Sequence, residues 1–150
     1  ALDLVGRKVM ADKGAALTLW STSVKLLIEA NLNNEAMKPF ISGLMTTAND
    51  LEKATTLIAT RAASSPDTVG AASFAYMQLL GITALTWMWT RVAAKALAQV
   101  NAGVEDADFY HNKLKTARFY MAYWAPQTRG LVKQIESASQ LIAEFDQADF

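Results

Sequence analysis

Residues 71–90 read AASFAYMQLLGITALTWMWT and contain no charged side chain. We predict that this run is part of one long helix, which begins at Ser65-Pro66-Asp67 and continues to about Asn101, because a cap candidate, a proline and an acid come first and Gly103 follows. A helix that is apolar on nearly every side must be enclosed by other helices or by lipid. The run therefore predicts either the central helix of a bundle or a membrane span.

The two alternatives differ in what would surround the helix. A span is supported by the length of about 20 residues, with Trp87 and Trp89 at one end and Arg91 beyond them. Polar residues interrupt the run, however, and the remaining helices carry apolar stripes that need a buried partner. We therefore favour the central core helix, and expect Trp87 or Met88 to face the interior. The interrupting residues are Ser73, Gln78, Thr83 and Thr86.

Four other segments show apolar residues at helical spacing. The first runs from about Leu2 to Asp12 with its stripe at Leu2, Val5 and Val9, and the second covers about Ala15 to Leu32. The third and fifth alternate spacings of four and three, over Met37 to Ala62 and over Tyr110 to Ile135 with a kink expected at Pro126. The stripe of the fifth includes Trp124 and Thr128. Together these patterns predict an all-α fold, an antiparallel up-down bundle of about five helices.

Composition excludes several classes of function. Lys and Arg number 14, as do Asp and Glu, so no net field attracts nucleic acid or an anionic membrane. The chain has no cysteine, which excludes disulfides and thiolate chemistry and is typical of a cytoplasmic protein. It also begins without methionine in what reads as helix interior, which predicts a fragment of a longer chain.

One candidate metal site and one candidate anion site can be found in the sequence. Asp108 and His111 have the carboxylate-x-x-His spacing of some bundle metal sites, but the motif would be needed twice and the chain has a single histidine, which we expect to be solvated. Lys113, Lys115 and Arg118 lie among aromatic residues, and we expect them to form the solvated face of a helix. The chain is predicted to contain no catalytic, cofactor-binding or metal-binding residues.

Three stretches of the sequence, residues 1–8, 80–89 and 109–120, resemble FAD-dependent acyl-CoA dehydrogenases. Residues 1–8, ALDLVGRK, are similar to the segment that follows the family's I-Y-E-G-T-N-G-I-Q motif. Residues 109–120, FYHNKLKTARFY, resemble the F-Y-x-x-K-x-x-T-A-R-F-[FY] run of an extra C-terminal helical domain in a large bacterial branch, and residues 80–89 resemble its long apolar helix. Residues 123–124 depart from the pattern, because Tyr-Trp stands where aliphatic residues are expected.

The resemblance implies a parent enzyme that converts an acyl-CoA thioester to the 2-enoyl-CoA. In the family a glutamate removes the α-proton while the β-hydride passes to FAD, and an electron acceptor later reoxidises the flavin. The glutamate belongs to the I-Y-E-G-T motif, so it would lie upstream of Ala1. We accordingly expect FAD in the parent and none in this chain.

The resemblance also implies a division of the chain and a set of partners. Residues 1–14 would end the upstream catalytic helical domain, residues 15–136 would form the helical extension, and residues 137–150 would be a loosely docked tail. Its partners would be the upstream domains and a second copy in a homodimer, with part of the stripe at Leu2, Val5 and Val9 left without a partner in this chain. The alternative is a stand-alone helical interaction or membrane-surface module without enzymatic activity.

Overall fold

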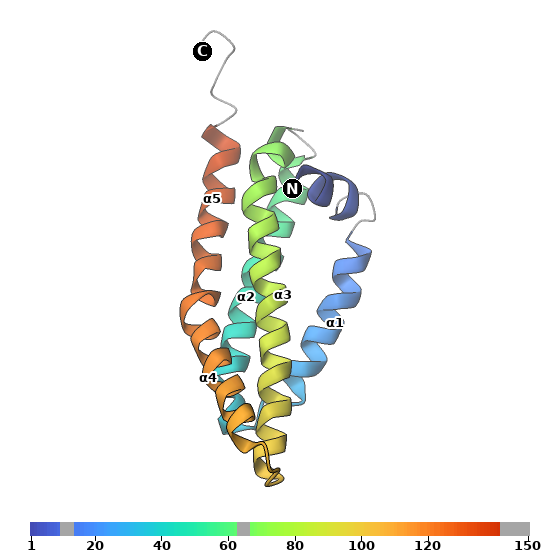
Figure 1. The fold of residues 1–150 in the computed structure, drawn as a ribbon. Helices are drawn as coiled ribbons and strands as arrows, with labels where there is room; N and C mark the ends of the chain where they lie inside the picture. The colour runs from blue at the N-terminus through green and yellow to red at the C-terminus, as the bar shows by residue number, and fades with distance from the viewer. Residues whose placement is uncertain (10–13, 63–66, 142–150) are drawn as a thin grey trace.

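The computed structural model describes residues 1–9, 14–62 and 67–141, and these are helical apart from short connections (Figure 1). Five α-helices make up the body of the structure. A π-helical segment precedes them, and the described residues also include two short 3-10 helices. The elements in chain order are η1 (Asp3–Val9), α1 (Ala15–Glu29), η2 (Glu35–Met37), α2 (Lys38–Ala62), α3 (Asp67–Asn101), α4 (Ala107–Tyr123), η3 (Ala125–Gln127) and α5 (Thr128–Leu141).

The fold of the described residues is all-α, as predicted, and α1 to α4 alternate in direction, while α5 continues in the direction of α4. In Figure 1 the chain descends through α1, ascends through α2, descends through α3 and ascends again through α4 and α5. The long helix α3 packs against α2, α4 and α5. The apolar run that predicted a central helix therefore lies in the helix that joins the bundle together.

Local sequence accounts for the ends of several helices. Asn34 accepts a hydrogen bond from the backbone N–H of Ala36 at 3.1 Å and so caps η2. Gly14 has φ +77° and Gly103 has φ +69°, a backbone conformation that glycine adopts at no steric cost. These two residues mark the start of α1 and the turn after α3, where the sequence predicted helix boundaries.

The core consists of two apolar clusters stacked along the bundle. One lies at the end where α5 and η1 pack, around Tyr76 and Ile58, and the other lies around Phe40 and Leu114. Between them on α3 lie the buried hydroxyls of three threonines, each bonded to the carbonyl four residues earlier at 2.8 Å, so burial leaves none of these hydroxyls without an acceptor. These residues are Thr83, Thr86 and Thr90.

The first predicted helix differs from the structure in form and in environment. The segment Asp3–Val9 is π-helical, and residues 10–13 lie outside the described residues. Val5 and Val9 are 0% and 6% exposed, since they pack into the cluster around Tyr76, whereas Leu2 is 60% exposed. The expectation of a stripe without a partner is thus wrong for both valines, because α3 covers this segment within the chain.

The fifth predicted helix is two helices in the structure. The α-helix ends at Tyr123, a 3-10 turn follows, and α5 begins at Thr128. Pro126 lies in that turn, where it has no N–H to donate and its ring excludes a continuous helix, so the chain breaks there instead of kinking. Trp124, expected on the buried stripe, is 42% exposed.

The segment that was predicted to be a loosely docked tail, residues 137–150, begins within α5. The helix α5 continues to Leu141, so the first five residues of the segment 137–150 are helical. Residues 142–150 lie outside the described residues.

Candidate functional site

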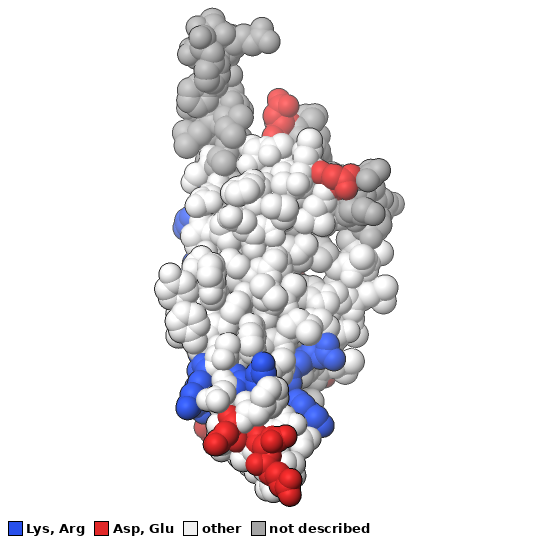
Figure 2. Space-filling view, viewed as in Figure 1, with Lys and Arg blue, Asp and Glu red and all other residues white. Residues whose placement is uncertain are grey.

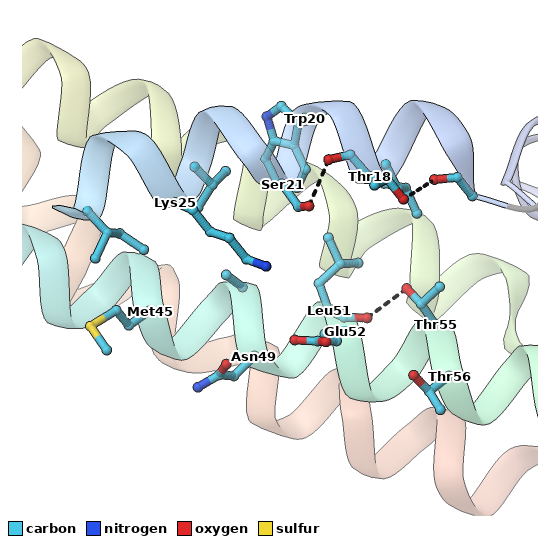
Figure 3. A pocket seen from close by; sticks show the side chains of 15 residues that line it. Thr18, Trp20, Ser21, Lys25, Met45, Asn49, Leu51, Glu52, Thr55 and Thr56 are labelled. Atoms are coloured by element: carbon cyan, nitrogen blue, oxygen red, sulfur yellow. Dashed lines mark hydrogen bonds between the residues drawn. The ribbon is translucent and has the colours of Figure 1, made fainter. Parts of the chain in front are cut away.

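A cleft of about 410 Å³ lies between α1 and α2 (Figure 3). It exists because α1 is lightly packed, with Val24 as its one buried residue. Trp20 and Leu51 provide apolar walls from the two helices, and Lys25 extends from α1 into the space beside α2. The cleft is an open trough between two helices.

The polar groups of this cleft are those of a solvated rim. Lys25, Asn49 and Glu52 are exposed, and Thr18 and Thr55 use their hydroxyls on backbone carbonyls four residues earlier in their own helices. Catalysis by general acid or base requires a group positioned at hydrogen-bond distance from a bound substrate. The rim holds no paired carboxylates, and no nucleophile beside a base.

A buried carboxylate occurs elsewhere, where α2 meets the start of α5. Asp50 is 8% exposed, and Thr128 Oγ1 lies 2.7 Å from its Oδ2 atom and 2.9 Å from the carbonyl oxygen of Ala125. The pair links α2 to the turn between α4 and α5. Sequence reasoning missed Asp50, since a single acid in an amphipathic helix gives no signal of burial; Thr128 was expected on the buried stripe.

Two tyrosines are buried at their hydroxyl ends. Desolvation raises the pKa of Tyr76 above its ordinary value, and the 2.7 Å hydrogen bond with Thr55 Oγ1 lowers it in part. Desolvation likewise raises the pKa of Tyr120, and Thr86 opposes that rise; the hydroxyl of Tyr120 donates to the carbonyl of Ile82 at 3.3 Å. Both phenols stay protonated near neutral pH and pin α3 to α2 and α4.

The candidates from the sequence analysis lie on the surface. Asp108 and His111 are exposed, as expected for a solvated histidine, and the described part of the chain has no group of three His, Cys, Asp or Glu residues that could hold a metal ion. The ammonium of Lys113 lies 5.0 Å from the centre of the Phe109 ring, and the ammonium of Lys115 lies 3.5 Å from Asn112 Oδ1 on the same helix. The basic cluster therefore covers the helix that carries it.

The long apolar helix was the remaining candidate. By length and composition, residues Val69–Asn101 could cross a membrane, and 39% of the most apolar window is buried in the bundle. Trp87 is half-buried and packs edge-on against Trp20 of α1, with ring centroids 6.1 Å apart, whereas Met88 is 44% exposed. The interior position expected for one of the two residues thus belongs to Trp87, whose indole N–H is buried and finds no hydrogen-bond partner among the described residues.

Comparison with known proteins identifies the chain. Residues 21–146 match the family described as "Acetyl-CoA dehydrogenase C-terminal like". The chain belongs to this family. The cleft and the exposed side chains described above are therefore features of an acyl-CoA dehydrogenase C-terminal domain.

A curated relative supports this assignment. The chain is 27% identical over 158 aligned residues to the broad-specificity linear acyl-CoA dehydrogenase FadE5 of Mycobacterium tuberculosis (strain ATCC 25618 / H37Rv). The alignment includes all of this chain and 26% of the relative. The chain therefore corresponds to about a quarter of that enzyme, which agrees with the resemblance carried by residues 1–8 and 109–120.

Proposed function

We propose that this acyl-CoA dehydrogenase C-terminal domain is the structural and assembly domain of a cytoplasmic, FAD-dependent acyl-CoA dehydrogenase. The parent would oxidise an acyl-CoA thioester to the 2-enoyl-CoA, with FAD as the hydride acceptor. The match over residues 21–146 carries the proposal, because it assigns the chain to a domain named for these enzymes. The catalytic glutamate would lie upstream, in the I-Y-E-G-T motif expected before Ala1.

The side chains of the domain support a structural role. Its buried polar groups link helices, as Asp50 and Thr128 join α2 to α5, and Thr55 and Tyr76 join α2 to α3. Flavin sites enclose the cofactor with several convergent polar groups. The described residues do not fit that requirement, since the α1–α2 cleft is open and its charged groups are at the rim. No step of the reaction is therefore assigned to this chain.

The first experiment extends the coding sequence upstream of Ala1 and expresses the parent. We expect an in-frame I-Y-E-G-T motif and a yellow protein whose flavin absorbance is bleached when an acyl-CoA is added without oxygen. Assays with acyl-CoAs of increasing chain length would then define the substrate. A start codon directly before Ala1, or a flavin that stays oxidised with every acyl-CoA, would contradict the proposal and favour a stand-alone module.

A pair of variants in the parent separates a structural from a catalytic role. His111→Ala removes the single histidine, which is exposed, and should leave kcat and KM unchanged. Ile58→Asp places a charge at a position that is 1% exposed and should lower the melting temperature of the parent by many degrees. A loss of kcat in His111→Ala at unchanged melting temperature would show that this domain takes part in the chemistry.

A further inference from the structure

A stripe along α3 has no covering helix in the described structure. It is centred on Gly81 and includes the positions 4, 7, 11 and 14 residues away in each direction. At about 100° per residue, all of them lie within roughly 40° of the direction in which Gly81 faces. Every member is exposed except Val92, which is half-buried. The members are Asp67, Gly70, Phe74, Met77, Gly81, Leu85, Met88, Val92 and Lys95.

The stripe is uncharged and apolar except at its two ends. Phe74 is 63% exposed, Leu85 52%, Met88 44% and Met77 37%, so four large apolar side chains face water in one row. Asp67 and Lys95 are the end members. A contiguous exposed apolar surface rimmed by charge is typical of an interaction site.

The two halves of the stripe are complementary in chemistry. When α3 is paired with an antiparallel copy of itself about Gly81, each apolar side chain meets an apolar residue or a glycine, and each charge meets its opposite. The central glycines have no side chain to hold the helices apart, and a Cβ there would meet nothing within 4 Å of its own chain. The opposing pairs are Met77 with Leu85, Phe74 with Met88, Gly70 with Val92 and Asp67 with Lys95.

We propose that this stripe is a two-fold interface with a second copy of the chain, in which the α3 helices pack antiparallel and cross at Gly81. A two-fold contact uses the same patch on both subunits, so the patch must complement itself. Figure 2 shows the face over α3, where a broad uncharged area separates acidic atoms near the top from a basic band in the lower third. An antiparallel copy places the acidic atoms near the top of one copy over the basic band of the other, while the acidic atoms at the lower tip in Figure 2 lie beyond that band.

Neighbouring apolar residues extend the surface beside the crossing point. The Tyr120 hydroxyl bonds to the Ile82 carbonyl, which places that turn of α4 level with Gly81. On the same helix Phe119 and Tyr123 stack with ring centroids 5.3 Å apart, and they are 59% and 57% exposed. A stable dimer needs about 800 Å² of buried surface on each partner. The aromatic stack adds to the stripe near the axis, where buried aromatic anchors contribute most.

The mass of the 150-residue chain in solution is the first test. Sedimentation from about 1 to 100 µM should show a species of twice the 16.3 kDa chain mass. Leu85→Glu places two carboxylates close to the axis and should weaken dimerisation at least tenfold. The control is Leu32→Glu, the same substitution at a similar exposure of 58%, in the connection between α1 and η2. It should leave the dimer intact, and equal weakening by both variants would overturn the proposal.

A disulfide tests the register, because the chain has no cysteine of its own. Gly81→Cys should form a covalent dimer on mild oxidation, since the two copies of residue 81 face each other across the axis. Gly130→Cys is the matched control, an exposed helical glycine on α5 whose Cβ would also meet nothing within 4 Å. Cross-linking of both variants at the same rate would contradict the assigned interface.

Charge reversal tests the two ends. Asp67→Lys and Lys95→Asp should each weaken the dimer several-fold at low salt, and the double variant should restore it because the pairs are then exchanged. A double variant weaker than either single one would overturn the antiparallel arrangement. A chain that stays monomeric at every concentration would overturn the proposed interface as a whole. The stripe would then be expected to pack against the upstream part of the parent enzyme.

Discussion

At the residue scale, the bond between Thr128 and Asp50 has the clearest energetic consequence. Thr128→Val keeps the shape of the side chain but removes the donor 2.7 Å from a buried carboxylate. Leaving a buried acceptor without its partner costs about 1–3 kcal/mol, and more when it is charged. Urea unfolding should therefore show a loss of at least this size. Thr60→Val, exposed and bonded within its own helix, should change stability by less than about 0.5 kcal/mol; similar losses for both would contradict this account.

Tyr76 predicts a dependence of stability on alkaline pH. Its pKa in the folded chain lies above the unfolded value of about 10, because burial disfavours the phenolate. The folded state then keeps a proton that the unfolded state loses, so the free energy of unfolding is unaffected below about pH 10 and falls as the pH rises above it. Tyr76→Phe should reduce this fall, whereas Tyr123→Phe, at an exposed position, should not. Urea titrations between about pH 8 and pH 11 measure the difference.

At the element scale, the segment η1 is part of the core. Val5 is 0% exposed beneath the cluster around Tyr76, so Val5→Asp buries a charge without a partner and should cost about 3 kcal/mol or more. Leu2→Asp in the same segment lies at a 60% exposed position and should be nearly neutral. Thermal melts of the two variants decide the matter. Equal melting temperatures for Val5→Asp and Leu2→Asp would show that η1 is detached from the bundle in solution.

The helix α3 should respond differently on its two sides. Trp87 packs against Trp20, whereas Met88 belongs to the exposed stripe. At concentrations low enough to keep the chain monomeric, Trp87→Asp should cost several kcal/mol and Met88→Asp less than about 1 kcal/mol. Urea unfolding measures both. If Trp87→Asp unfolded at the same urea concentration as the unmutated chain, that side of α3 would lie at the surface and the membrane alternative would be supported.

The elements also show what periodicity could and could not predict. The stripe from Met37 to Ile58 is buried or half-buried as expected, because four-three spacing fixes one face of a straight helix whatever its neighbours are. The break at Trp124 was harder to predict, since Pro126 permits either a kink or a new helix and the sequence pattern does not distinguish the two. In the structure Thr128, at the start of the new helix, bonds to Asp50. The exposed side of α3 could not be predicted either, because a helix that is apolar on nearly every side gives no sign of which face packs against another helix.

At the scale of the whole molecule, the sequence predicted the helix bundle and the family. About a site, it predicted only that the chain contains no catalytic, cofactor-binding or metal-binding residues. The resemblance rested mainly on residues 1–8 and 109–120, and the family match over residues 21–146 confirms it. The cleft between α1 and α2 carried no sequence signal, because it arises from the light packing of a whole helix. Asp50 shows the same limit, since its burial depends on α5, which is distant in sequence.

The whole molecule also predicts how the chain treats flavin. By resemblance, the one part of this chain near the flavin is the segment at residues 1–8, and there Val5 is turned into the bundle. The α1–α2 cleft offers Lys25 at an open rim, which is too little to enclose a dinucleotide. The 150-residue chain mixed with FAD should therefore leave gel filtration colourless, while the parent leaves it yellow. Flavin that eluted with the isolated chain in a one-to-one ratio would show that the domain contains a complete flavin site. The flavin chemistry of the parent would then have to be assigned to this domain.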